Sequence, residues 1–268
     1  MNQIKTFGNS SNTDVTIITV VRNHEAGLIS TMKSVLSQVH KNWNSIIVVG
    51  ESGDNTLEIA RKYSSKNSNV QVVEQSGTGI YEAMNEGSKM VTSKYVWYMN
   101  AGDQFHDEFS LQTAVKESEE TSLDLLIGGH RIENSRDSKG YSFPAKVITP
   151  FKFSINRRFG CHQSMLFLTS KVKELGYYDT KYKIVADFDL VMRMCATGLV
   201  KRTPSMMAIV EPGGGADQNI IFVHHEKQAV RKALLDSRLQ VFIGEIWTLL
   251  AILKIKLKKT INNMVKDH

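Results

Sequence analysis

Short apolar runs alternate with amphipathic segments through the first hundred residues. The apolar, β-rich runs predict buried strands at residues 15–21, 46–49, 70–73 and 95–99. Apolar positions at helical spacing predict helices at residues 27–39, 56–63 and 80–91. Strands that alternate with helices are typical of βαβ crossovers, so we expect an α/β fold with a parallel sheet covered on both faces. Ligands of such sheets bind beyond the carboxyl ends of the strands.

The second half of the chain is less regular. Residues 123–132 and 163–168 have the character of strands, and residues 187–196 predict a helix. The segment Pro212–Gly215 breaks regular structure and predicts a flexible loop. From about His224 the pattern predicts helix to the end of the chain. We therefore divide the chain into an irregular segment (1–13), an α/β domain (14–220) and a helical extension (221–268).

Composition narrows the class of protein. Hydrophobic residues make up 41% and charged residues 22% of the 268 residues, as in an ordinary folded domain. The two cysteines, Cys161 and Cys195, lie far apart and belong to no metal-binding pattern, so we expect neither a disulfide framework nor a structural zinc. The polar stretch from Met1 to Asp14 lacks the apolar core of a signal peptide. A reducing cytoplasm fits these features best.

The positive charge is concentrated in the extension. Residues 224–268 hold nine Lys and Arg against four Asp and Glu, whereas residues 1–223 hold 24 against 23. A surface that binds nucleic acid would distribute its charge over the folded domain. We therefore expect no nucleic-acid partner for the domain. A basic module that binds membranes or nucleic acid would explain only the extension.

The sharpest local motif is NAGD at residues 100–103, directly after a predicted strand. A carboxylate beside a glycine at the carboxyl end of a parallel strand lies where the backbone can approach a phosphate. Hard divalent cations are commonly held by one carboxylate together with substrate phosphates. Asn, Gly and Asp are also turn formers, so the motif alone is equally compatible with an Asx turn.

A second motif, ADFDL at residues 186–190, opens an amphipathic helix. Asp189 and Arg193 are four residues apart and are expected to pair on the helix surface. This pairing would leave Asp187 as a carboxylate aimed into the crevice at the end of the sheet. The alternative is that Asp187 is the N-cap of the helix, a role that aspartate fills well.

Taken in order, these motifs resemble family 2 glycosyltransferases of the GT-A fold, especially bacterial members that assemble polysaccharides. The resemblance spans about residues 14–215 and is more specific than any single motif. The segments that carry it are TIITVVRN at 16–23, SVLSQ at 34–38, IIVVGESGDNT at 46–56, GIYEAMNEG at 79–87, NAGD at 100–103, HQ at 162–163 and DFDL at 187–190.

The resemblance implies a catalytic centre built on two aspartates. Asp103 would bind a Mg²⁺ or Mn²⁺ ion that bridges the diphosphate of the nucleotide, with Asn100 supporting it. Asp187 would be the general base that removes the proton of the acceptor hydroxyl. His162 and Gln163 would lie on the acceptor side.

The resemblance also implies a donor site. Its residues near the nucleotide base and ribose would be Thr19, Asn23, Glu51 and Asp54. Its residues at the floor of the pocket would be Gly79, Tyr81 and Asn85. The chain departs from the family pattern at Gly50-Glu51, where the family usually has Asp, and at Gly77, where related chains often have Asp.

The implied reaction is a single in-line displacement with inversion at the anomeric carbon. A hexosyl group would pass from a nucleotide-sugar donor, expected to be UDP-linked, to a glycan or lipid-diphosphate-linked acceptor in surface polysaccharide synthesis. The rival hypothesis is a catalytically silent nucleotide- or sugar-binding protein on the same fold. The departures at Gly50 and Gly77 are its support, whereas retention of Asp103 and Asp187 opposes it.

The extension contains the apolar run VFIGEIWTLLAILKIKL at residues 241–257. Its 17 residues include Glu245, Lys254 and Lys256, which makes it a poor transmembrane span. Lysines after an apolar run that contains Trp247 suit a helix lying in an anionic membrane interface, here over residues 241–259. Such a helix would hold the enzyme on the inner face of the plasma membrane. Alternatively, the helices pack on the domain or on another subunit.

Overall fold

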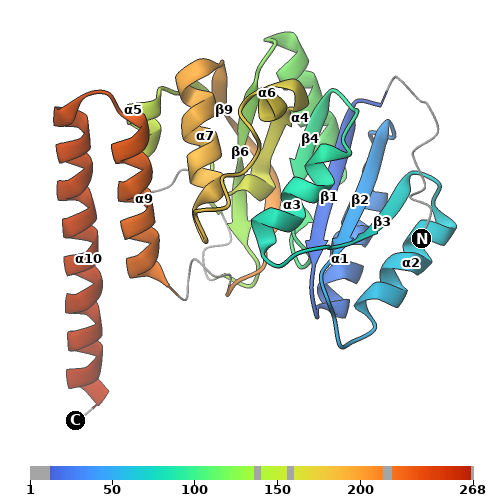
Figure 1. Cartoon of the computed structure of the whole chain (residues 1–268), viewed down its shortest axis with the longest axis horizontal. Helices are drawn as coiled ribbons and strands as arrows, with labels where there is room; N and C mark the ends of the chain where they lie inside the picture. The colour runs from blue at the N-terminus through green and yellow to red at the C-terminus, as the bar shows by residue number, and fades with distance from the viewer. Residues whose placement is uncertain (1–12, 136–139, 156–159, 214–218, 267–268) are drawn as a thin grey trace.

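The structure is a computed structural model that describes residues 13–135, 140–155, 160–213 and 219–266. Nine strands form one mixed sheet in the order β3-β2-β1-β4-β8-β6-β9-β5, and β7 pairs with β9 outside this path (Figure 1). The expected α/β architecture with a helical C-terminal part is confirmed. The proposed irregular segment, apart from Thr13, lies outside the described residues, as does half of the predicted loop at Pro212–Gly215.

The strands are β1 (Val15–Val21), β2 (Trp43–Val49), β3 (Val70–Glu74), β4 (Tyr95–Tyr98), β5 (Gln104–Phe105), β6 (Leu125–Ile132), β7 (Lys146–Val147), β8 (Met165–Leu168) and β9 (Val200–Val210). The helices are α1 (Glu25–Leu36), α2 (Thr56–Lys66), α3 (Ile80–Lys89), α4 (Ser110–Glu120), α5 (Pro150–Ser154), α6 (Thr169–Glu174), α7 (Ala186–Thr197), α9 (Ile220–Leu234) and α10 (Arg238–Lys266). A 3₁₀ turn, η1 (His162–Ser164), precedes β8.

The N-terminal half of the sheet is parallel. Strand β1 lies between β2 and β4, with Ile18 opposite Ile46 on one side and Tyr98 on the other. Every residue of β1 and β2 is buried, as expected for strands covered on both faces. Because β3, β2, β1 and β4 run in one direction, the loops that follow them meet at one edge of the sheet.

Helices cover both faces of the sheet and enclose two apolar clusters. Alternate side chains of β1 enter different clusters, Ile18 on the face of α3 and α7 and Ile17 on the face of α1, α2 and α4. Helix α3 packs very closely, because a Cβ added at Gly87 would lie 2.9 Å from Ile18 and 3.2 Å from Val48. This close packing holds α3 directly against β1 and β2.

The C-terminal half contains strands that the sequence pattern did not predict. Strand β9 runs parallel to β6, with register shifts between Ile127 and His130. Its apolar pattern is interrupted by Lys201, Arg202 and Pro204, which disfavour a strand assignment from sequence. The bulged pairing tolerates these residues.

The extension forms two helices rather than one continuous helix. Helix α9 begins at Ile220 and ends at Leu234, and α10 begins at Arg238, so the predicted helical extension is divided by a short break at residues 235–237. Helices α9 and α10 lie side by side at the outer end of the molecule (Figure 1). Among the helices described, none combines the length and the apolar character needed to cross a membrane.

Candidate active site

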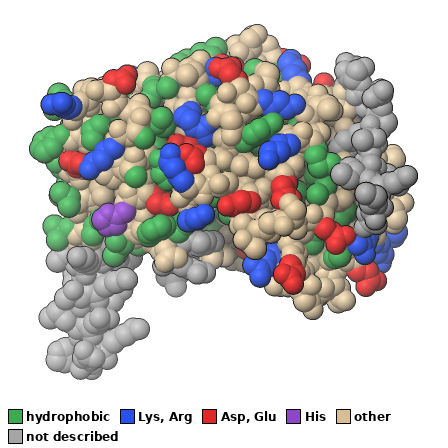
Figure 2. All heavy atoms as spheres, in the orientation of Figure 1, with side chains coloured by type: hydrophobic (Ala, Val, Ile, Leu, Met, Phe, Trp, Pro, Cys, Tyr) green, Lys and Arg blue, Asp and Glu red, His purple; other side chains and the backbone are tan. Residues whose placement is uncertain are grey.

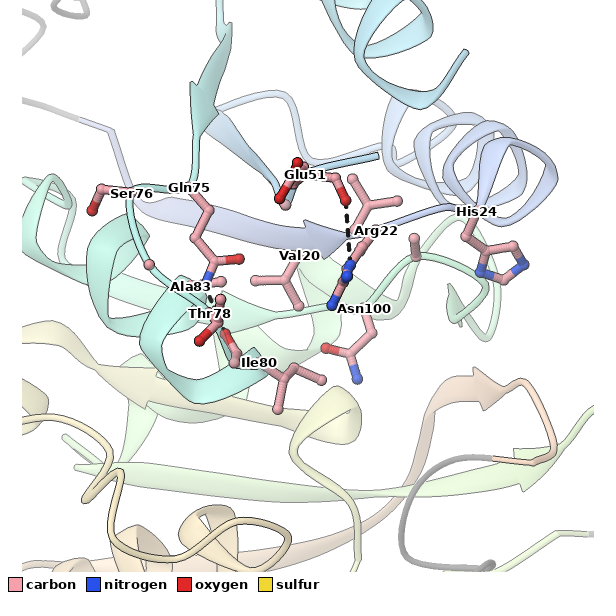
Figure 3. A pocket seen from close by; sticks show the side chains of 15 residues that line it. Val20, Arg22, His24, Glu51, Gln75, Ser76, Thr78, Ile80, Ala83 and Asn100 are labelled. Atoms are coloured by element: carbon pink, nitrogen blue, oxygen red, sulfur yellow. Dashed lines mark hydrogen bonds between the residues drawn. The ribbon is translucent and has the colours of Figure 1, made fainter. Parts of the chain in front are cut away.

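A cavity of about 600 Å³ lies at the edge of the sheet where the parallel strands end (Figure 3). Its walls come from the four loops that follow β1, β2, β3 and β4, together with the start of α3. This is the position at which open parallel sheets bind ligands. The lining residues are Val20, Val21, Arg22, His24, Gly50, Glu51, Gln75, Ser76, Gly77, Thr78, Gly79, Ile80, Ala83, Asn100 and Ala101.

Arg22 is the one Lys or Arg among the described residues that line this cavity. Its Nε donates a hydrogen bond to the backbone oxygen of Glu51, 3.2 Å away, and Figure 3 shows its side chain between Glu51 and Asn100. Across the cavity, Nε2 of Gln75 donates to the backbone oxygen of Gly79 at 2.8 Å. Sequence analysis missed Arg22 and Gln75, although each directly follows a parallel strand.

Three of the predicted donor residues line the cavity: Glu51, Gly79 and Asn100. Gly79 precedes α3 with φ of +114°, a backbone conformation that favours glycine. A side chain there would also collide with Glu82. The backbone conformation at position 79 therefore explains why the GIYEAMNEG segment begins with glycine.

The other predicted nucleotide-side residues, Thr19, Asn23 and Asp54, are not among the residues that line the cavity. Thr19 is fully buried in β1. Oδ1 of Asn23 accepts a hydrogen bond from the backbone N–H of Gly53 at 2.7 Å. Oδ1 of Asp54 accepts from the N–H of Thr56 at 3.1 Å, and hydrogen bonding to Thr56 lowers the pKa of Asp54. Asn23 and Asp54 thus shape the loop between β2 and α2.

Tyr81 and Asn85 do not line the cavity either. The Tyr81 hydroxyl donates to the backbone oxygen of Ile184 at 2.6 Å and lies 3.5 Å from Oδ1 of Asp187. Asn85 makes two hydrogen bonds to the backbone of Tyr178, one as donor at 2.9 Å and one as acceptor at 3.0 Å. These residues connect the cavity wall to the loop before α7.

Asp103 follows β4 and is only 4% exposed. Its Oδ2 accepts a hydrogen bond from Nε2 of Gln163 at 2.7 Å, and its Oδ1 accepts from the backbone N–H of Glu211 at 2.9 Å. Burial raises the pKa of Asp103 to about 6. Gln163 therefore holds the predicted metal ligand in place, and its contact with an acceptor stays a prediction.

The oxygen atoms around the NAGD turn fit a hard divalent cation that takes further ligands from a substrate. Oδ1 of Asn100 is buried and makes no hydrogen bond within the described part of the chain. The Thr31 hydroxyl fixes the turn by donating to the backbone oxygen of Asp103 at 2.6 Å. The described residues contain no group of three or more His, Cys, Asp and Glu that could hold a metal ion without other ligands. Mg²⁺ and Mn²⁺ bind to proteins in this way through one or two side chains plus phosphates.

Asp187 is the second residue of α7, whose N-cap is Val185, so the alternative that Asp187 is the N-cap is wrong. Its side chain is 18% exposed. Oδ1 accepts from the backbone N–H of Phe188 at 2.7 Å, and Oδ2 lies 3.6 Å from Nδ1 of His162. The expected pair of Asp189 and Arg193 is confirmed at 2.7 Å, but Asp189 is buried, so the pair does not lie on the helix surface as predicted.

The η1 turn brings the two predicted acids together. Gln163 binds Asp103, and the preceding residue, His162, faces Asp187. His162 is 6% exposed, and neither ring nitrogen has a hydrogen bond among the described residues. Asp103 and Asp187 are 84 positions apart in sequence and are linked through two adjacent side chains.

Residues 16–176 match the protein family described as Glycosyl transferase family 2. The "PGL/p-HBAD biosynthesis glycosyltransferase" of Mycobacterium tuberculosis is 24% identical over 236 residues, which are 86% of this chain and 90% of that protein. Among solved structures, residues 1–349 of TarS from S. aureus match with a TM-score of 0.69 and 15% identity over 88% of this chain and 70% of that one. TarS has also been solved with UDP and with UDP-GlcNAc. A mannosyltransferase of Pyrobaculum calidifontis, in complex with GDP-Man and Mn²⁺, matches with a TM-score of 0.65 and 15% identity over 88% of this chain and 70% of that one.

Proposed function

Because the chain belongs to glycosyl transferase family 2, we propose that it transfers a sugar from a nucleotide-sugar donor to an acceptor hydroxyl. One observation carries this proposal. The η1 turn holds Asp103 through Gln163 and faces Asp187 through His162, beside a cavity at the carboxyl ends of the parallel strands. This arrangement offers a diphosphate site and a carboxylate base within one region.

The donor would occupy the 600 Å³ cavity, a volume in the range that small-molecule sites use. Arg22 would meet the negative charge of the diphosphate, and Glu51 would approach the ribose. We propose a UDP-linked sugar, in keeping with the nucleotide in the TarS complexes. The GDP-Man in the Pyrobaculum complex keeps GDP-linked donors among the alternatives to test.

Asp103 and Asn100 would hold the Mg²⁺ or Mn²⁺ ion. When bound, such a cation neutralises charge that develops on the departing nucleoside diphosphate. Asp187 accepts the proton of the acceptor hydroxyl as that oxygen attacks the anomeric carbon. The C–O bond to the diphosphate breaks on the opposite side, so the configuration inverts. His162 lies where it can orient Asp187 for this proton transfer.

We propose that the acceptor is a glycan or a lipid-diphosphate-linked oligosaccharide of the cell surface. The Mycobacterium relative is named a PGL/p-HBAD biosynthesis glycosyltransferase, which supports a biosynthetic acceptor for this chain. The rival, a silent binding protein, would bind the donor equally well but would show no turnover dependent on Asp187.

A binding measurement tests the donor site first. We expect one nucleoside diphosphate among UDP, GDP and dTDP, tested alongside CMP, to raise the unfolding midpoint in the presence of Mn²⁺. Arg22→Ala should weaken that binding by about tenfold, because a charge-assisted hydrogen bond contributes about 1.5–3 kcal/mol. Calorimetric titration measures both effects.

Arg61→Ala is the matched control. Arg61 is an exposed arginine on α2 that does not line the cavity, and it forms an ion pair with Glu74 at 2.6 Å. It should bind the nucleotide like the wild type. If no nucleotide binds with either metal, the transferase proposal loses its basis.

We also propose that α10 lies on an anionic membrane surface. Its outward face carries large apolar side chains that are 36–67% exposed, and Figure 2 shows hydrophobic side chains along the outer edge formed by this helix. These residues are Leu239, Phe242, Ile246, Trp247, Leu249, Leu250 and Leu253. The opposite face packs on α9, where Thr248 accepts a hydrogen bond from Arg231 at 3.0 Å and Glu245 pairs with Lys232 at 2.9 Å.

Charge supports a lipid partner for this face. Lysines 254, 256, 258 and 259 follow the apolar residues in sequence, and their side chains lie outside the described atoms. A cluster of lysines beside an apolar helix face is typical of helices that bind anionic lipids. The site would then work at the inner face of the plasma membrane.

The protein is expected to sediment with vesicles that contain phosphatidylglycerol and to do so less at high salt. Replacing Leu249 and Leu253 together by Ser should reduce the bound fraction severalfold, because each substitution removes apolar area that would be buried in the membrane interface. Val147→Ser, at an equally exposed apolar residue on β7, is the control. Self-association in solution without lipid binding would instead identify this face as a subunit interface.

A further inference from the structure

The carboxylate of Glu226 binds the backbone immediately before the catalytic helix. Glu226 lies on α9, outside the segment that matches the family, and is 9% exposed. Its oxygens accept hydrogen bonds from three consecutive N–H groups: Lys183 at 2.7 Å, Ile184 at 3.0 Å and Val185 at 3.2 Å. The last of these residues is the N-cap of α7, two positions before Asp187.

We propose that Glu226 is a positioning residue for Asp187, so that helix α9 completes the active site rather than only linking the domain to the membrane helix. The inference rests on the proposed role of Asp187 as general base. Glu226 itself touches no reacting atom. It acts by fixing the segment from which Asp187 projects.

The loop is held from two sides at Ile184. Glu226 accepts the N–H of this residue, and the Tyr81 hydroxyl donates to its C=O at 2.6 Å. Tyr81 belongs to α3, whose first turn lines the donor cavity. The backbone of Ile184 is thus held between α3, which borders the donor cavity, and α9 of the extension.

Other bonds secure the earlier part of the same loop. Arg193 donates to the backbone oxygens of Leu175 and Tyr177, and Asn85 binds the backbone of Tyr178. In the described part of the chain, the N–H groups of residues 183–185 donate to one side chain of another element, that of Glu226. Asp187 therefore depends on Glu226 for the placement of its helix start.

Burying the Glu226 carboxylate costs desolvation free energy, which its hydrogen bonds must offset. An anion loses hydration on burial, and only several directed donors offset that loss. The three N–H groups lie at and just before the N-cap of α7, so they provide hydrogen bonds near the positive end of the helix dipole. A glutamate in this position fixes the loop in direction as well as in distance, which an apolar contact would not do.

Helix α9 also affects the electrostatics near the base. Burial lowers the pKa of Lys227 to about 8, and the negative charge of Asp187 acts in the opposite direction on the same ammonium group. The Lys227 ammonium lies 5.3 Å from the ring centre of Phe188, the residue after Asp187. Two adjacent residues of α9, Glu226 and Lys227, therefore lie close to the segment that carries Asp187.

Glu226→Gln tests the inference because it keeps the side-chain size while replacing one accepting oxygen by an NH₂ group. We expect kcat to fall by about 10- to 100-fold, since a misplaced base loses much of its orientation advantage. The donor Kd should stay within about twofold of the wild type, as the cavity residues are unchanged. Steady-state kinetics and calorimetric titration of the full chain measure the two quantities.

The matched control is Arg231→Gln, five residues further along the same helix. Arg231 is 5% exposed, donates to the backbone oxygen of Ser154 and to the Thr248 hydroxyl, and lies 5.9 Å from the ring centre of Phe188. Its loss destabilises α9 without removing a hydrogen bond to residues 183–185. It should lower the unfolding midpoint yet keep kcat. Equal kcat in the two variants would overturn the inference.

A double-mutant cycle separates positioning from a general loss of structure. In the Asp187→Asn background, adding Glu226→Gln should lower the residual turnover by less than twofold. The effects of two substitutions are not additive when both residues act through the same step. Full additivity would contradict the inference. If Asp187→Asn alone keeps wild-type turnover, the proposed function fails, whatever Glu226→Gln does.

Tyr81→Phe serves if Glu226→Gln does not fold. The variant removes the hydroxyl that donates to the Ile184 carbonyl and that also lies 3.5 Å from Oδ1 of Asp187, and it leaves the buried ring in place. We expect a severalfold loss of kcat with unchanged donor Kd. An unaltered kcat would show that the position of this peptide does not control the base.

Discussion

Asp187→Asn is expected to reduce kcat by about a thousandfold while leaving the donor Kd within about twofold of the wild type. General-base catalysis by a positioned side chain contributes about 10²–10⁴-fold, and asparagine cannot accept the proton. The substitution keeps the amide oxygen available to the N–H of Phe188, so the start of α7 is preserved. Single-turnover kinetics with a nucleotide-sugar donor, together with calorimetric titration, measures the separation.

Asp189→Asn provides the comparison within the same helix. Asp189 is 3% exposed and pairs with Arg193, which holds the loop before α7. Its loss should lower the unfolding midpoint more than Asp187→Asn does and should reduce kcat far less. If Asp187→Asn weakened donor binding as strongly as it weakened turnover, Asp187 would belong to the donor site instead.

The parallel half of the sheet could be predicted because its signals are local. Strands β1 and β2 are continuous apolar runs, and α1 and α3 show their apolar positions at helical spacing. The placement of NAGD at the end of a strand follows from this pattern, and so does the pair of Asp189 and Arg193, which are one helical turn apart.

The cavity itself could be predicted only in part. The rule that ligands bind at the carboxyl ends of parallel strands locates Glu51, Gly79 and Asn100, and applied strictly it also locates Arg22. Motif resemblance added Asn23, whose side chain binds the loop between β2 and α2 and whose place in the donor site stays a prediction. Resemblance identifies positions in a motif but does not tell which side chains turn toward the ligand.

Contacts between distant segments could not be predicted from the sequence. Gln163 binds Asp103 across 60 positions, and Glu226 binds the backbone 41 to 43 positions before it. Neither pair has a periodicity or a motif that joins its members. Strand β9 was missed for a related reason, since its partner β6 tolerates Pro204 through a bulged register that only the folded sheet defines.

Asp103→Asn is expected to lower Mn²⁺-dependent nucleotide affinity by about a hundredfold without destabilising the metal-free protein. The variant loses the negative charge that a divalent cation requires. Its hydrogen bonds can be kept, because the Asn oxygen accepts the N–H of Glu211 and its NH₂ group can donate to Gln163 once that amide turns over. Titration of the nucleotide with Mn²⁺ and with EDTA measures the metal-dependent part.

The pH dependence of stability distinguishes this explanation from a purely structural one. The pKa of Asp103 is about 6 in the folded protein and 3.8 in the unfolded chain, so the folded state binds more protons between these values. The carboxyl group therefore stabilises the fold most below pH 3.8, and this contribution is lost as pH rises through 6. With EDTA present, Asp103→Asn should gain up to about 3 kcal/mol relative to the wild type between pH 4 and pH 7. The opposite result would be an Asp103→Asn variant that is equally destabilised at every pH and still binds nucleotide through Mn²⁺. Asp103 would then only join η1 to the end of β9, and the cation would be held elsewhere.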